Sequence, residues 1–388
     1  MTSSDRLNAI PPYPFVEMEK SISEKKKEGV DIISFGIGDP DISPPSFVNE
    51  ALIDGLELPG SHNYSSSEGE LFFRETISEW FKHRFNVDVD PKTEICAVIG
   101  SKEGLGNLQR GLLNPGDKVV CPNPCYPLYQ NAGTILNDAV PVEITLEKEN
   151  QFKPDLDNLQ STDFTNIFLN YPNNPTGAVV DKNYLIELVD ICKNKKSQII
   201  YDNAYSEVTF NDYKAPSILE ADPELECSIE FHSLSKTFNM TGYRIGFAVG
   251  NSELISTLKK VKSQIDSGSP IFVQHAASEA LKKYHNGNPP NEILKNLELY
   301  SKRMSLIAEG FKEFGFEVDI PLGTFYLWVE VGNDSKTITD KLLEQGIVVT
   351  PGAGFGTNGK NFIRLAATVN EDRINEAIDR LKYRRFNF

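Results

Sequence analysis

Short runs rich in β-branched and aromatic residues alternate with longer amphipathic stretches between about residues 50 and 285. The helix-like stretches include NYLIELVDICKNKK at 183–196. The strand candidates are 94–100, 118–122, 166–172, 198–205, 228–234 and 243–250. Strands that alternate with helices in this way predict an α/β fold with a mainly parallel sheet covered by helices on both faces.

The alternation of strand-like and helix-like stretches ends at the segment YHNGNPPNE (284–292), where Gly, Asn and two prolines interrupt it. A long helical pattern follows at 293–315, and strand-like runs follow at 324–331 and 361–366. These elements predict a smaller α+β domain. We therefore expect a large domain over 46–285 and a small domain formed by 1–45 together with 286–388.

Composition and charge narrow the class of protein. The chain has 388 residues with 39% hydrophobic and 10% aromatic residues, which suits a globular protein with a sizeable core. Its net charge of −16 argues against nucleic acid or an acidic membrane as a partner, so any phosphate site must be built locally.

The cysteines and the N-terminal segment predict a cytoplasmic protein. The five cysteines are odd in number and form no CxxC pair, so we expect reduced thiols and neither a disulfide framework nor a metal site. The first fifteen residues contain no apolar run typical of a signal peptide, and no stretch is long and apolar enough to span a membrane.

Polar clusters follow several of the predicted strands. They are GSKEG at 100–104, NNPTG at 173–177, DNAY at 202–205 and SLSK at 233–236. Each alone is explained by a helix cap or a turn. Ligands of open parallel sheets bind beyond the carboxyl ends of the strands, so the four clusters together predict one binding site.

Two motifs point to other functions. GAGFG at 352–356 resembles a dinucleotide-binding loop, but a strand-like run follows it where that motif requires a helix, so we expect a glycine-rich turn. Ser233 and Lys236 fit the S-x-x-K pattern of serine acyl-transfer enzymes. The SDN and KTG companions of that pattern are missing, which leaves acyl transfer as a distant alternative.

A lysine, a carboxylate, a phosphate cup and a ring-stacking residue together suit pyridoxal 5′-phosphate. Lys236 would form a Schiff base with the cofactor aldehyde, and burial and the nearby Arg244 would lower the pKa of its amine. Asp202 would keep the pyridine nitrogen protonated. Asn174 and Tyr205 would bind the 3′ oxygen, and Tyr126 would stack on the ring. The phosphate would be held by Ser101, Lys102, Ser233, Ser235 and Arg244.

The motif SLSKTFNMTGYRIG at 233–246 resembles the lysine segment of fold type I pyridoxal-phosphate-dependent aminotransferases of class I/II. NNPTG, DNAY and CYPLY (125–129) match further motifs of that family in its order, and the similarity extends from HNYSSSEG (62–69) to IRLA (363–366). The resemblance implies an aspartate-aminotransferase-like fold with a seven-stranded sheet, and transfer of an amino group between an amino acid and a 2-oxo acid.

The resemblance also implies roles for individual residues. Lys236 would move the proton between the substrate Cα and cofactor C4′. Arg364 would grip the substrate α-carboxylate, which the backbone at Gly38 approaches. Tyr64 would reach the phosphate of a neighbouring subunit, which implies a homodimer with shared active sites.

Within the family, the chain is most similar to the LL-diaminopimelate aminotransferases, in stretches such as PPYPFVEMEK, LNYPNNPTGAV and EFHSLSKTFNMTG. That similarity implies amino transfer from glutamate to tetrahydrodipicolinate in lysine biosynthesis. Tyr13, Lys102 and Asn174 would contact the substrate, and Ser267, in the DSGSP loop at 266–270, would come from the other subunit.

One position departs from that pattern. Plant-type members carry a glutamate where this chain has Ser67, with Glu68 one step later. A broad-specificity aminotransferase for alanine, aspartate or aromatic amino acids, or a C–S β-lyase on the same fold, therefore stays open. The segment 261–270 lacks the arginine of aspartate-selective relatives, which counts against a dedicated aspartate enzyme.

Overall fold

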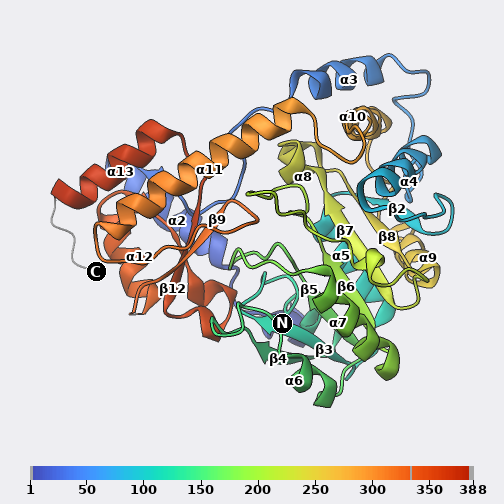
Figure 1. Ribbon diagram of the computed structural model, residues 1–388, viewed down its shortest axis with the longest axis horizontal. Coiled ribbons are helices and arrows are strands. Elements are labelled where there is room, and N and C mark those ends of the chain that lie inside the picture. Colours follow the sequence, from blue (N-terminus) through green and yellow to red (C-terminus); the bar gives the residue numbers. More distant parts are fainter. Residues whose placement is uncertain (1–2, 333, 384–388) are drawn as a thin grey trace.

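A seven-stranded sheet forms the larger part of the molecule. The computed structural model describes residues 3–332 and 334–383 (Figure 1). The strand order is β2-β8-β7-β6-β5-β3-β4, and β8 alone runs against its neighbours in this sheet. The strands are β2 (Ile95–Val98), β3 (Lys118–Asn123), β4 (Val140–Thr145), β5 (Asn166–Leu169), β6 (Gln198–Asp202), β7 (Ser228–Ser233) and β8 (Gly246–Gly250). The predicted α/β class with a mainly parallel sheet is confirmed.

Six of the seven strands lie where the sequence pattern placed them, and β4 was missed. β4 contains Pro141, which cannot donate a ladder hydrogen bond. The strand is at the edge of the sheet and pairs only with β3, so a proline is tolerated there.

Helices cover both faces of this sheet. Ile95 and Ala97 of β2 belong to one apolar cluster, whereas the alternate residues Cys96 and Val98 belong to another. Because successive strand side chains point to opposite faces, both faces of β2 are buried against apolar side chains. The helices in this part are α3 (Ser46–Leu56), α4 (Leu71–Phe85), α5 (Ser101–Leu112), α6 (Leu156–Ser161), α7 (Lys182–Lys195), α8 (Leu234–Thr237), α9 (Ser252–Lys262) and α10 (Ile271–Leu281).

Local sequence explains where these helices begin and end. Asp181 caps α7 by accepting from the backbone N–H of Tyr184, and Lys196 ends it in a left-handed conformation. Asn251 caps α9 in the same way as Asp181 caps α7. The predicted helix at 183–196 is therefore confirmed to within one residue at each end.

A second group of elements packs beside the large sheet, at the left of Figure 1. A three-stranded antiparallel sheet has the order β11-β12-β9, and β1 pairs in parallel with β10 through Ile33 and Ile347. The strands are β1 (Ile33–Ser34), β9 (Tyr326–Glu330), β10 (Ile347–Val348), β11 (Thr350–Pro351) and β12 (Phe362–Ala366). The helices are α2 (Pro14–Lys27), α11 (Asn291–Lys312), α12 (Ser335–Glu344) and α13 (Glu371–Tyr383). α1 (Asp5–Asn8) lies instead against the part built on the large sheet, where Arg6 forms an ion pair with Asp138.

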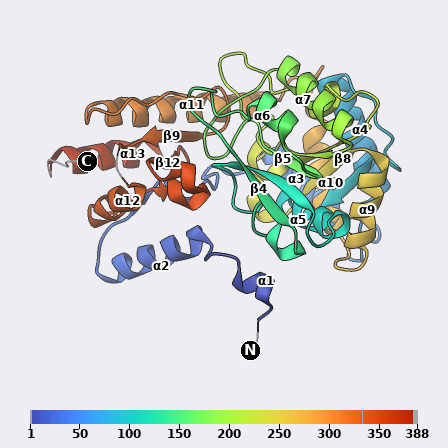
Figure 2. The same cartoon turned by 90° about the horizontal axis from the view of Figure 1, so that it is seen from below.

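Figure 2 shows α1 and α2 along one side of the molecule, joined by extended chain to the rest. Short 3-10 turns complete the fold at Ile135–Asn137, Ile218–Glu220, Thr241–Tyr243, Gly352–Phe355 and Thr357–Gly359. None of the helices in the described part of the chain is long and apolar enough to cross a bilayer.

Candidate active site

The candidate site lies at one edge of the seven-stranded sheet. β3, β5, β6 and β7 are parallel, so their carboxyl ends share that edge. β8 is antiparallel to both β2 and β7, and Gly246 at its start is in register with Val98 and with Ser233. The start of β8 therefore meets the ends of β2 and β7, which brings Arg244 to the residues that follow those strands.

A cavity of about 380 Å³ opens at this edge. Its volume falls within the range of small-molecule and cofactor sites. Every site residue expected from the sequence lines it except Tyr64 and Ser267. The lining residues that the sequence predicted are Tyr13, Gly38, Ser101, Lys102, Tyr126, Asn174, Asp202, Tyr205, Ser233, Ser235, Lys236, Arg244 and Arg364.

Lys236 extends from the short helix α8 into the cavity. Its Nζ donates a hydrogen bond to the backbone oxygen of Gly38 at 2.6 Å. Burial lowers the pKa of the Lys236 amine, and the charges of Arg364 and Arg244 lower it further. Asp39 acts in the opposite direction, but the net change is downward. The amine is thus biased toward its neutral, nucleophilic form.

Asp202 is the last residue of β6 and is almost fully buried. Its Oδ2 accepts a hydrogen bond from the Tyr129 hydroxyl at 2.9 Å, whereas its Oδ1 has no hydrogen-bond partner among the described residues. Burial raises the pKa of Asp202 from 3.8 to about 6, although the hydrogen bond from Tyr129 acts in the opposite direction. A buried carboxylate oxygen without a partner is costly and indicates a ligand with a proton to donate.

Five residues form an anion cup at one end of the cavity: Ser101, Lys102, Ser233, Ser235 and Arg244. α5 begins here, with Gly100 as its N-cap, so the first backbone N–H groups of the helix face an incoming ligand. A Cβ at position 100 would overlap Nη2 of Arg244, so glycine is required for this approach. Arg244 is itself fixed by donating to the backbone oxygens of Thr241 and Ile99.

Arg364, on β12, also lines the cavity and is only 2% exposed. Its Nη1 donates to Oδ1 of Asn174 at 2.7 Å, and its Nη2 donates to the backbone oxygen of Gly36 at 2.9 Å. The guanidinium also lies over the ring of Tyr326, 4.1 Å from its centroid. A buried arginine held in one plane beside a cavity is suited to binding a carboxylate with two parallel hydrogen bonds.

The mouth of the cavity carries groups of both charge signs. Tyr13, just before α2, shares a hydrogen bond with the hydroxyl of Tyr126 at 3.2 Å. Lys102 donates to the Tyr13 hydroxyl at 3.4 Å. Glu19 of α2 also lines the cavity, and its exposed carboxylate forms no hydrogen bond or ion pair with the described residues.

Tyr64 and Ser267 do not line this cavity. Tyr64 is 91% exposed. Ser267 is also exposed. It lies close to the segment that carries Tyr64, since the Ser65 hydroxyl donates to the backbone oxygen of Ser267 at 3.0 Å. Glu68 is bound by Arg74 at 3.0 Å and by Lys259 at 2.7 Å, so its charge is already compensated.

Sequence reasoning missed nine lining residues, among them Tyr326, Tyr129 and Glu19. Tyr326 pairs with the Tyr205 hydroxyl at 2.9 Å, and a Cβ at Gly38 would overlap the hydroxyl of Tyr326. Tyr129 was visible in the CYPLY motif, three positions after Tyr126, but its bond to Asp202 depends on the fold. Glu19 gave no signal, because an acidic residue on an amphipathic helix is normally only solvated.

The two motifs that pointed elsewhere have structural explanations. GAGFG begins a 3-10 turn at Gly352–Phe355, as expected from the strand that follows it. No hydrogen bond joins Ser233 to Lys236 among the described residues, and the Ser233 hydroxyl instead accepts from the Ser235 N–H. In the same part of the chain, all five cysteines are buried and free, and no group of metal-binding side chains is found.

Comparison of the sequence with protein-family models matches residues 30–381 to the model described as aminotransferase class I and II. The LL-diaminopimelate aminotransferase of Halothermothrix orenii is 42% identical over an alignment of 388 positions that covers 98% of each chain. The LL-diaminopimelate aminotransferase of Aquifex aeolicus is 43% identical over 385 residues, again covering 98% of each chain.

Two solved structures are similar over nearly their full length. BacF from Bacillus subtilis, without ligand, has a TM-score of 0.92 at 34% identity and covers 100% of this chain and 98% of its own. The aspartate aminotransferase of Thermus thermophilus, solved with maleate, has a TM-score of 0.90 at 28% identity and covers 99% of both chains.

Proposed function

The chain belongs to the class I and II aminotransferases, and on that premise we propose that it uses pyridoxal 5′-phosphate to transfer the amino group of LL-diaminopimelate. In the biosynthetic direction glutamate donates the amino group and tetrahydrodipicolinate accepts it. The products are then 2-oxoglutarate and LL-diaminopimelate. The reaction then belongs to lysine biosynthesis in the cytoplasm. Relatives that carry this name over 98% of the chain support the substrate.

The observation that best supports pyridoxal phosphate as the cofactor is the buried Oδ1 of Asp202, which has no hydrogen-bond partner among the described residues. A protonated pyridine nitrogen supplies the missing donor, and the cavity offers an amine at Lys236 and an anion cup for the phosphate. When bound, pyridoxal phosphate supplies an aldehyde that captures the amino group and a ring that withdraws electrons from the substrate Cα. These residues fit the group.

The remaining cofactor contacts follow from the same placement. Asn174 and Tyr205 would donate to the 3′ oxygen, and the hydroxyl of Tyr205 pairs with that of Tyr326. Tyr126 would pack against the ring. Ser101, Lys102, Ser233, Ser235 and Arg244 hold the phosphate.

Lys236 has two tasks that its geometry supports. Its lowered pKa leaves a fraction of neutral amine to attack the aldehyde. With the cofactor bound, the same Nζ would also be within the cavity to carry a proton between the substrate Cα and C4′. Arg364 and the backbone at Gly38 fix the α-carboxylate, so the Cα–H bond is presented to Lys236 in one orientation.

We also propose a homodimer with shared active sites and the division into domains at 46–285 and 1–45 with 286–388. Tyr64 and Ser267 lie outside the cavity of their own subunit and are exposed, which suits contacts with the site of a partner subunit. Ile33 and Phe35 pack in the same apolar cluster as residues of α11 and α13, which supports grouping the N-terminal segment with the C-terminal one.

An amino-donor and acceptor panel tests the proposal. The purified protein, loaded with pyridoxal phosphate, should lose its visible absorbance when LL-diaminopimelate or glutamate is added, and 2-oxoglutarate should restore it. Bleaching by alanine, aspartate or aromatic amino acids but not by LL-diaminopimelate would indicate a broad-specificity enzyme. Pyruvate and ammonia from cysteine conjugates without an acceptor would indicate a β-lyase.

The distal end of diaminopimelate carries both a carboxylate and an ammonium. Lys102 would meet the carboxylate. Glu19 is an acid of the cavity that would meet the ammonium, since Glu68 is already paired and Asp39 acts on the charge of Lys236. Glu19→Gln should raise KM for LL-diaminopimelate about fivefold, the range of a partly exposed ion pair. KM for glutamate, which has no second ammonium, should stay unchanged.

Glu24→Gln is the matched control, because Glu24 is an exposed acid on the same helix that does not line the cavity. Equal effects of the Glu19 substitution on both substrates would contradict this role and point to a general displacement of α2 instead.

A further inference from the structure

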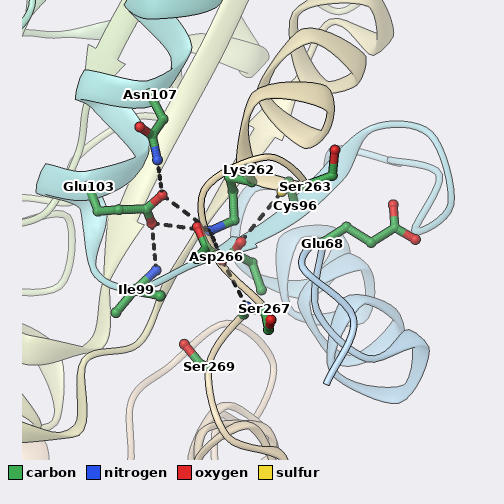
Figure 3. A network of polar contacts seen from close by, with 12 residues as sticks. Glu68, Cys96, Ile99, Glu103, Asn107, Lys262, Ser263, Asp266, Ser267 and Ser269 are labelled. Atoms are coloured by element: carbon green, nitrogen blue, oxygen red, sulfur yellow. Dashed lines mark hydrogen bonds and ion pairs between the residues drawn. The ribbon is translucent and has the colours of Figure 1, made fainter. Parts of the chain in front are cut away.

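A fully buried lysine lies between two carboxylates behind the anion cup. Lys262, at the end of α9, is 0% exposed. Its Nζ lies 3.2 Å from Oε1 of Glu103 and 3.0 Å from Oδ2 of Asp266 (Figure 3). None of these three side chains lines the cavity. The cluster carries a net charge of −1 and has no part in the chemistry described above.

One arm of the cluster reaches the helix that builds the anion cup. Glu103 is in the first turn of α5, directly after Ser101 and Lys102. Its Oε2 accepts from the backbone N–H of Ile99 at 2.8 Å, and its Oε1 accepts from Asn107. This carboxylate therefore fixes the turn between β2 and α5, but it also places a negative charge beside the site of a dianionic phosphate.

The other arm reaches the loop at 266–270. Asp266 accepts from the backbone N–H of Gly268 at 2.8 Å, which shapes the loop. The hydroxyl of Ser269 in this loop donates to the backbone oxygen of Arg244 at 3.1 Å. The loop thus supports the peptide that carries Arg244, one of the two cationic members of the anion cup. Lys262 joins both supports of the cup through one ammonium.

We propose that Lys262 is a positioning residue for phosphate binding: its charge offsets the two carboxylates that brace the cup, so that they hold Ile99 and the 266–270 loop without repelling the phosphate. This inference rests on the proposed use of pyridoxal phosphate. The effect of Lys262 should be confined to the phosphate end of the ligand and should not reach the aldehyde or the ring.

The test compares the affinities of the apoenzyme for pyridoxal phosphate and for pyridoxal, which lacks the phosphate. Lys262→Met keeps the length of the side chain and changes the charge of the cluster from −1 to −2. It should raise Kd for pyridoxal phosphate about tenfold or more while changing Kd for pyridoxal little, because only the former carries the repelled charge. Absorbance titration and calorimetry both measure this ratio.

Charge compensation separates positioning from general structural support. In Lys262→Met/Glu103→Gln the net charge returns to −1, and the glutamine oxygen can still accept from Ile99, so the preference for the phosphorylated ligand should be largely restored. Glu103→Gln alone should shift the ratio of affinities the opposite way, in favour of pyridoxal phosphate. This single variant tests the inference even if Lys262→Met fails to fold.

Two outcomes would overturn the inference. Lys262→Met could leave the ratio of affinities unchanged, for example by weakening both ligands equally, which is the sign of a purely structural residue. Alternatively, the double variant could fail to restore the ratio. In each case a wild-type protein that binds pyridoxal phosphate leaves the proposed function standing. A wild-type protein that does not bind pyridoxal phosphate would refute both.

Discussion

Lys236→Ala is expected to abolish amino transfer, lowering kcat/KM at least about 10⁴-fold, because in the proposed mechanism one amine would supply both the attachment point and the proton carrier. The variant should stay folded. Burial lowers the pKa of the Lys236 amine, which means that the charged amine destabilises the folded protein. Removing the amine should therefore not lower the free energy of unfolding. Stopped-flow absorbance with glutamate or LL-diaminopimelate measures the loss, and thermal unfolding measures the stability.

Lys260→Ala is the matched control for this experiment, because Lys260 is an exposed lysine of α9 remote from the cavity lining. It should leave kcat/KM unchanged. Lys236→Arg keeps the positive charge but removes a nucleophile with a usable pKa, so it should be as inactive as the alanine variant. An arginine variant with substantial activity would show that charge alone, and not the lysine amine, is needed.

Much of the fold was readable because strand and helix periods differ along the chain. Runs such as SIEFHSL became β7 over Ser228–Ser233, and the residues after each parallel strand met at one edge as the topology requires. β4 was hidden by Pro141, which only an edge strand tolerates. Nothing in a single sequence reveals that a strand is at the edge.

The candidate site was predictable where its residues follow strands and unpredictable where they arrive from elsewhere. Asp202, Ser233 and Lys236 come directly from the ends of β6 and β7. Tyr326 and Glu19 come from β9 and α2, and their contact with the cavity depends on packing between distant segments. The ion pair of Lys262 with Glu103 spans 159 positions, so no local pattern could indicate it.

Asp202→Asn is expected to lower activity and raise the stability of the apoenzyme together. An amide cannot hold the proton on the ring nitrogen as a carboxylate does, so kcat should fall about 10²- to 10³-fold, the usual cost of losing one preorganised electrostatic group. The geometry is otherwise kept, because the amide oxygen can still accept from Tyr129.

The gain in stability follows from the pKa of Asp202, which burial raises from 3.8 to about 6 in the folded protein. A raised pKa means that the stability which Asp202 contributes is fully present below about pH 4 and is lost as the pH rises through 6. Asparagine does not titrate. The stability difference between variant and wild type should therefore grow in favour of the variant by about 2.5 kcal/mol between pH 4 and pH 8, measured by denaturant unfolding without cofactor.

Asp222→Asn should change the pH dependence of stability in the opposite direction in the same experiment. Asp222 is also buried, but the backbone N–H of Cys227 and the ammonium of Lys193 lower its pKa despite that burial. Its contribution to stability is present at neutral pH and is lost as the pH falls through the lowered pKa, so Asp222→Asn should destabilise the protein at pH 7 and approach wild type in acid. If both variants changed stability in the same direction with pH, burial would not be what sets the charge of Asp202.

Saturating pyridoxal phosphate should erase the stability advantage of Asp202→Asn, since the pyridinium would give the wild-type carboxylate the partner that its Oδ1 lacks.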